Sequence, residues 1–123
     1  MKKIKISISV ISPFSETNSC VIGVFNDKTN TISYTEDDML VNIKMGKSII
    51  IQRSCADYTL ELVFEEGKTI ESLYRIKKPK MDIKVNVDTK VLRRNKMSFY
   101  IEYKLKLNEE DMGLTCIDFE AEE

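Results

Sequence analysis

The feature that most constrains the fold is an alternation of apolar and polar residues that runs from residue 81 to residue 107. A polar segment and a turn at Arg93, Arg94 and Asn95 interrupt the alternation, and it then resumes. Because successive side chains of a β-strand point to opposite faces, this pattern predicts an antiparallel hairpin with one buried face. The residues expected at the centre of the core are Val85, Val87, Phe99, Ile101 and Tyr103.

Charge matching predicts the register of this hairpin. Pairing Asp82 with Lys104 and Lys84 with Glu102 places opposite charges side by side. A slip of two residues would set Lys84 opposite Lys104, and like charges in that position destabilise a sheet. The same register places Lys77 and Lys78 beside Asn108, Glu109 and Glu110.

The rest of the chain consists of short apolar segments separated by turn residues, and no window shows a helical period. Residues 12–18 are predicted to form a loop. Ile49, Ile50 and Ile51 interrupt the alternation and predict a strand that is buried on both faces or locally bulged. Outside the hairpin, the expected strands cover residues 3–11, 19–25, 31–35, 39–45, 48–54, 58–64, 69–75 and 112–120.

Complementary charges at the two ends of the chain predict how the strands close. Lysines of the first strand and acidic residues of the last would lie side by side if these strands paired antiparallel. Such pairing removes the edges that make long strands prone to aggregation. We therefore predict an all-β, up-and-down antiparallel meander of about eight to ten strands, closed into a barrel that forms one domain over residues 1–123. The charged residues are Lys2, Lys3, Lys5, Asp118, Glu120, Glu122 and Glu123.

Composition excludes several classes of partner. The chain has 19 Lys and Arg against 20 Asp and Glu, and this formal net charge of -1 favours neither nucleic acid nor a membrane surface. The first apolar residues alternate with polar ones, which is not the pattern of a signal peptide. No apolar run reaches the roughly 20 residues that span a bilayer.

The cysteine content argues against a metal site. Cys20, Cys55 and Cys116 form no CxxC pair, and the chain contains no histidine, so neither a zinc site nor any other metal centre is expected. Cysteines without partners are commonly small buried core residues, and we expect no disulfide. A reduced, cytoplasmic protein is the prediction that fits.

No catalytic constellation is found in the sequence. A P-loop, a G-x-S-x-G motif and a dinucleotide fingerprint are all missing, so we expect neither an enzyme nor a cofactor. The basic runs at residues 77–80 and 93–96 lie at opposite ends of one long strand, which favours solvated turns over a nucleic-acid site. Paired carboxylates occur only in turns, where solvated charge is the expected role. These pairs are Asp37 and Asp38, Glu65 and Glu66, and Glu109 and Glu110.

Several short motifs between residues 31 and 117 occur in an order and at a spacing that is similar to one known family. They are Tyr34-x-Glu36, Arg53-Ser54, residues 62–68, Tyr74 before Pro79, and residues 101–108. With these motifs the chain resembles the YwiB-like bacterial proteins, and departs from them at Lys80 and Met81, where they usually place an aromatic residue and a glycine. The resemblance implies a calycin-type, lipocalin-like β-barrel and no settled activity.

Two functions are compatible with such a barrel. The first is a non-enzymatic binding protein for a small apolar or anionic ligand in the barrel interior, and the second is a protein-interaction or structural domain with a filled core. Arg53 ends an apolar strand and could bind a carboxylate or phosphate, or form a structural ion pair with a nearby acid. An enclosed cavity of about 300 Å³ or more would favour the ligand, whereas a packed interior would favour the second function. The ligand-binding residues predicted are Arg53, Phe64, Tyr74, Phe99 and Tyr103.

Overall fold

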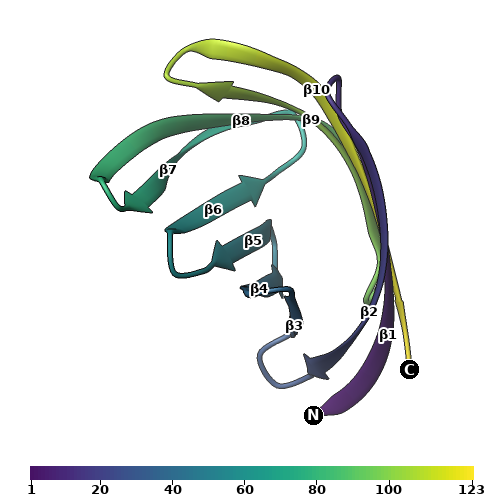
Figure 1. Cartoon of the computed structure of the whole chain (residues 1–123). Coiled ribbons are helices and arrows are strands. Elements are labelled where there is room, and N and C mark those ends of the chain that lie inside the picture. Colours follow the sequence, from purple (N-terminus) through teal and green to yellow (C-terminus); the bar gives the residue numbers. More distant parts are fainter.

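The computed structural model describes all residues from 1 to 123. It contains ten antiparallel strands and no helix (Figure 1). No helix is therefore present with the length and apolar character that crossing a membrane requires. Each strand pairs with its neighbours in sequence, and β1 also pairs with β10, so the meander closes into a barrel as predicted. The strands are β1 (Lys2–Ile11), β2 (Glu16–Asn26), β3 (Thr31–Glu36), β4 (Met39–Met45), β5 (Ile49–Ser54), β6 (Tyr58–Phe64), β7 (Thr69–Lys77), β8 (Lys80–Arg94), β9 (Phe99–Leu107) and β10 (Glu110–Glu122).

The seam between β1 and β10 confirms the expected closure but only part of the expected match of charges, because Asp118 and Glu120 lie opposite Ser9 and Ser7. The two strands pair over seven positions, with Lys5 opposite Glu122. Beyond the last paired position, Lys2 Nζ lies 3.1 Å from Glu123 Oε1. Figure 1 shows that the two termini lie close together. An exposed pair of this kind contributes little free energy, at most about 1 kcal/mol, but opposite charges across a seam favour this closure over pairing with another chain.

The predicted register of the β8–β9 hairpin is wrong. Asp88, and not Asp82, lies opposite Lys104, a difference of six residues along β8. The segment expected to break the pattern continues as strand, with a register shift between Thr89 and Val91, and the turn follows only after Arg94. The extra length of β8 and its bulge move every pair relative to the expectation.

The charges on which that register rested are matched on the other side of β8. Lys84 Nζ lies 3.3 Å from Glu71 Oε2 of β7, and Asp82 lies opposite Arg75 of the same strand. Because a strand inside a sheet has two neighbours, matching charges with one neighbour does not specify a register.

The expected neutralisation of the basic turn is also wrong. Lys77 and Lys78 lie where β7 turns into β8, and Lys77 Nζ donates to the Cys55 backbone oxygen at 2.8 Å. Asn108 lies elsewhere, where its backbone N–H donates to the Lys84 oxygen at 3.0 Å. The loop predicted at 12–18 is shorter than expected, because β2 begins at Glu16.

Strand β5 is neither bulged nor buried on both faces. It pairs with β4 and β6 in one unbroken register. Ile49 and Ile51 are buried and Ile50 is only half-buried, so the ordinary alternation continues to Arg53 on the interior face.

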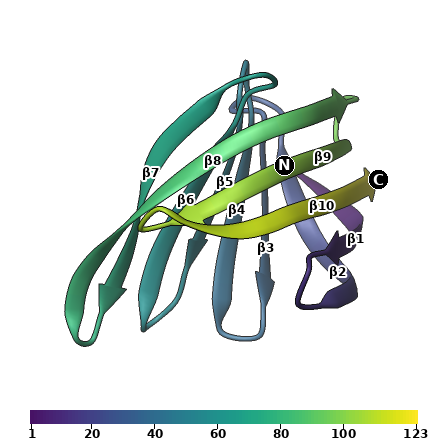
Figure 2. The same ribbon diagram turned by 90° about the horizontal axis from the view of Figure 1, so that it is seen from above.

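The interior of the barrel is packed at one end and incompletely filled at the other. At the end near the termini, called here the closed end, inward side chains are at most 3% exposed, and burying each contributes about 1.5–3 kcal/mol. At the opposite end, called the open end, inward side chains are partly exposed. Figure 2 shows that the turns of the β1–β2, β3–β4, β5–β6 and β7–β8 hairpins lie on one side of the barrel, which is the open end. The closed end contains Ile4, Phe25, Ile32, Met45, Ile49, Phe64, Phe99 and Phe119; the open end contains Ile8, Val10, Met39, Arg53, Tyr58, Leu60 and Tyr74.

Candidate functional site at the open end of the barrel

Arg53 enters the interior near the open end. It lies opposite Val41 of β4 and Leu60 of β6, both of which face inward. Together with residues of β1 to β4 it lines a cavity of about 240 Å³. The other residues of this cavity are the apolar Ile8, Val10, Met39 and Val41 and the polar Thr17, Ser19, Tyr34, Glu36 and Asp37.

The cavity exists because β2 and β3 separate. These strands pair over only three positions, and the last pair toward the open end is Val24 with Ser33. A Cβ on the preceding Gly23 would lie 2.7 Å from the Ser33 backbone oxygen, so only glycine allows so close an approach where the pairing ends. Further toward the open end, the Ser19 hydroxyl of β2 donates to Glu36 Oε1 of β3 at 3.2 Å, across the gap between the two strands.

The guanidinium of Arg53 has no protein partner. It takes part in none of the four ion pairs of the structure and donates no hydrogen bond. Arg94 shows the usual alternative, because its guanidinium donates to the backbone oxygens of Met45, at 2.9 Å, and Gly46. Arg53 therefore keeps its donors free beside a cavity, where a guanidinium can bind a carboxylate or phosphate with two hydrogen bonds.

Three tyrosine hydroxyls lie within the electrostatic influence of Arg53. Burial raises the pKa of Tyr34 to about 12, and the charge of Arg53 opposes this rise while Glu36 adds to it. Burial also raises the pKa of Tyr58 and of Tyr103, again against Arg53. All three hydroxyls are therefore protonated at neutral pH and can donate or accept hydrogen bonds.

Aromatic contacts hold these rings in place. Tyr58 packs edge-on against Tyr74 with ring centroids 5.2 Å apart, and its hydroxyl lies 3.9 Å from the Met39 sulfur. Tyr103 packs edge-on against Phe64 at 4.9 Å. Such pairs add about 0.5–1.5 kcal/mol beyond the burial of their surface, so the polar end of the interior is built on rings of fixed orientation.

The residues predicted from the sequence separate into two groups. Of these, Arg53 alone lines the cavity, Tyr74 is half-buried at the open end, and Tyr103 is 7% exposed and part of the core. Phe99 lies at the closed end, where it stacks on Phe119 at a centroid distance of 4.7 Å, and Phe64 is fully buried. These two phenylalanines belong to the packed core.

Sequence reasoning did not single out Tyr34, Tyr58, Met39 and Glu36 as site residues. Their inward direction follows from the alternation of β3, β4 and β6. These residues meet beside Arg53 because of the register between the strands and the gap between β2 and β3. Neither the register nor the gap follows from the sequence of a single strand.

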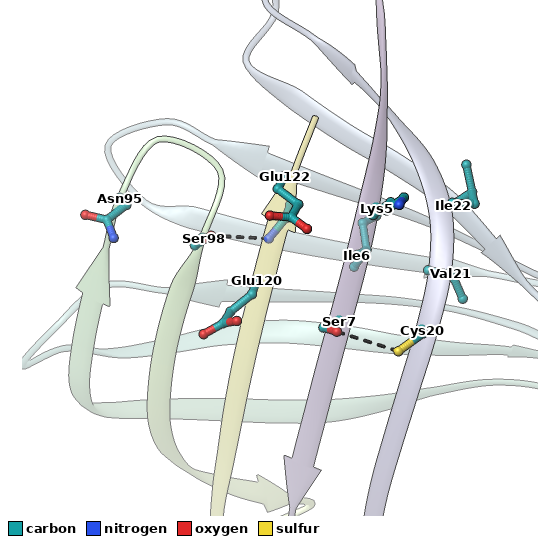
Figure 3. Close-up of a pocket in the computed structure, with 11 residues that line it drawn as sticks. Lys5, Ile6, Ser7, Cys20, Val21, Ile22, Asn95, Ser98, Glu120 and Glu122 are labelled. Atoms are coloured by element: carbon teal, nitrogen blue, oxygen red, sulfur yellow. Dashed lines mark hydrogen bonds between the residues drawn. The ribbon is translucent and has the colours of Figure 1, made fainter.

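Two larger hollows, of about 580 Å³ each, lie on the outer face. Figure 3 shows the first, which is formed by β1, β2, β10 and the β8–β9 turn, with Ser7 beside Cys20. Its one cation, Lys5, lies directly opposite Glu122, so its charges are already matched. The second also touches Arg53, but the alternation of β5 directs Gln52 outward to this hollow and Arg53 inward.

The remaining reactive groups do not form a second site. All three cysteines are free and apart from one another, and no three Cys, Asp or Glu side chains are grouped so that they could hold a metal ion. The pKa of Glu65 is lowered because its neighbour Lys68 donates a hydrogen bond to it in an exposed turn. That shift stabilises the ionised form and does not create a general acid.

The closed ten-stranded meander is a calycin-like β-barrel with a small cavity of mixed apolar and polar lining at one end. Residues 7–119 match the model of a family described as a domain of unknown function, DUF1934, and the chain belongs to this family. The crystal structure of the ywiB protein from Bacillus subtilis is similar, with a TM-score of 0.60 and 14% sequence identity over 98% of this chain and 91% of that chain. At this identity the likeness shows the fold alone. A comparison with curated proteins found no match.

Proposed function

We propose that the protein is a non-enzymatic binding protein that holds a small molecule at the open end of its barrel, with Arg53 as the anchor for an anionic group. The observation that carries this proposal is the unpaired guanidinium on the interior face of β5, beside a cavity. A charged group that is partly removed from water is stabilised by a partner of opposite charge, and no protein acid supplies one.

The size of the cavity limits the ligand. Its volume of about 240 Å³ is below the roughly 300–1,000 Å³ of common ligand pockets. The packed closed end leaves no continuation through the barrel. The ligand is therefore small, or its remainder stays outside the rim.

The experiment is a titration of the protein against small carboxylates and phosphate esters, followed by NMR chemical shifts or calorimetry. Arg53→Gln should weaken binding at least tenfold while the unfolding curve in urea stays nearly the same. Arg75→Gln is the matched control, because it removes the same charge from an exposed position of β7. Equal binding by the wild type and Arg53→Gln would exclude Arg53 as the anchor.

A filled structural or protein-interaction domain is the second candidate, and two observations favour it. The first is that the cavity beside Arg53, at about 240 Å³, is smaller than the roughly 300 Å³ that would favour a ligand. The second is a pair of exposed apolar side chains. Ile22 and Val24 lie on the outer face of β2 and are 53% and 40% exposed. A protein partner would cover them. Loss of a pull-down partner in Ile22→Ser, together with no binding of small molecules by the wild type, would place this candidate first.

The setting that we propose is the reducing cytoplasm, which suits three free cysteines. Neither nucleic acid nor a membrane surface is proposed as a partner. The basic clusters lie at opposite ends of β8 and do not form one patch, and Lys77 and Arg94 donate to backbone oxygens of this chain.

A further inference from the structure

We propose that the cavity at the open end selects a compact monoanion with an apolar body, of the size of benzoate or hexanoate, and that Glu36 and Asp37 exclude dianions such as phosphate monoesters. This inference rests on the proposed function and specifies its ligand. Three properties of the cavity carry it: its charges, its walls and its volume.

The charges allow one negative group. Arg53 is the single cation that lines the cavity, and Glu36 and Asp37 are two anions on the same wall. A carboxylate can match the guanidinium with two hydrogen bonds. A second negative charge on the ligand would meet no second cation and would be repelled by the two acids, which is a way of rejecting unwanted partners.

A hydrogen bond keeps Glu36 available for this role. Its Oε1 accepts from the Ser19 hydroxyl at 3.2 Å, which ties the carboxylate to the rim between β2 and β3. Glu36 forms no ion pair with Arg53 within 4.0 Å. The acid therefore lines the same cavity as Arg53 without occupying the anchor.

The walls require an apolar body. Ile8 and Val10 of β1 and Met39 and Val41 of β4 form the aliphatic part of the lining, and the first three of these side chains remain partly exposed. A ligand that covered these side chains would remove apolar surface from water, which favours binding by about 25 cal/mol for each Å² covered. A bare inorganic anion would leave this surface uncovered.

The volume sets the upper size. A water molecule occupies about 30 Å³ of liquid, and non-hydrogen atoms of organic ligands need a comparable share, so 240 Å³ accommodates about eight of them. Benzoate and hexanoate are of this size. A long-chain fatty acid is about twice as large and would leave most of its chain in solvent.

The test compares benzoate, hexanoate, phenyl phosphate and palmitate, each titrated into the wild type, Glu36→Gln and Arg53→Gln. The wild type should bind benzoate or hexanoate at least tenfold more tightly than phenyl phosphate and more tightly than palmitate. Glu36→Gln, whose amide can still accept from Ser19, should bind benzoate about three- to tenfold more tightly and gain more for phenyl phosphate. Glu61→Gln is the control, because it removes one acid from the outer face of β6.

Three different failures are distinguishable. If the wild type binds phenyl phosphate or palmitate more tightly than benzoate and hexanoate, and Arg53→Gln loses this binding, the ligand class is overturned and the proposed function stays intact. If the wild type and Glu36→Gln are folded and neither binds any of the four ligands, both the ligand class and the proposed function are overturned. No change in the preference on Glu36→Gln would exclude Glu36 as a determinant of specificity.

Discussion

The two ends of this barrel use the same strands for different purposes. At the closed end, the inward side chains are large and apolar, such as Phe25, Met45 and Phe119, which are about 1% exposed. At the open end, the inward positions include polar side chains that are partly exposed, such as Ser19 on the strand of Phe25 and Arg53 on the strand of Ile49. The comparison teaches that burial at one end supplies the stability that permits a polar, incompletely packed site at the other.

The strands also differ in the length over which they pair, but this difference does not follow the two ends, because β6 and β7 pair at the open end and separate toward Phe64. β1 and β2 pair over ten positions, whereas β2 and β3, and also β6 and β7, pair over only three. Unpaired stretches of strand leave backbone groups to water and lower local stability. The gap beside β3 coincides with the cavity at Arg53, and the gap between β6 and β7 coincides with an outer hollow.

The largest effect should come from breaking the closed end outright. Deletion of residues 112–123 removes most of β10, including the buried Ile117 and Phe119, and exposes the edges of β1 and β9. We expect the truncated chain to unfold or aggregate. Size-exclusion chromatography and circular dichroism measure this, and a monomeric chain of unchanged stability would show that closure is not needed.

Single substitutions should differ between the ends. Ile101→Ala, in the fully buried row of β9, should lower the free energy of unfolding by roughly 2–5 kcal/mol. Val10→Ala, at the half-buried open end, should lower it by less than about 1 kcal/mol. Urea unfolding of both variants is the measurement, and equal losses would contradict the distinction between the two ends.

Alkaline pH should destabilise the wild type through Tyr34. The pKa of its hydroxyl is about 12 in the folded chain against 10.0 in the reference state, so the unfolded chain loses this proton first as pH rises. The contribution of this hydroxyl to the free energy of unfolding is therefore fully present below pH 10 and is lost between pH 10 and 12. At pH 11 the loss is about 1.4 kcal/mol. Urea unfolding of Tyr34→Phe from pH 8 to 11 should show a correspondingly smaller loss, and parallel curves would contradict the shift.

The smallest expected effect on stability belongs to Arg53. Since its guanidinium has no acidic partner, Arg53→Leu should change the free energy of unfolding by less than about 1 kcal/mol at pH 7. Loss of a structural ion pair would instead cost about 3–5 kcal/mol. Urea unfolding separates the two results, and the larger loss would make Arg53 a structural residue and weaken the proposal for the open end.

Much of the fold could be predicted because its determinants are local. The alternation around Val85 and Ile101 established which face of each strand is buried, since the period of two follows from strand geometry alone. The complementary charges of β1 and β10 predicted closure correctly. The same alternation, continued past Ile51, places Arg53 on the inner face.

The tertiary structure alone decided the register of β8, the position of its bulge and the end at which the barrel opens. Each strand has two neighbours, so Lys84 could satisfy its charge with Glu71 on β7 as well as with the acid expected on β9. The separation of β2 from β3 depends on how all ten strands fill one interior, a condition that no single segment contains. Which side chains face inward is a local property, but which of them meet around Arg53 is settled only when the barrel closes.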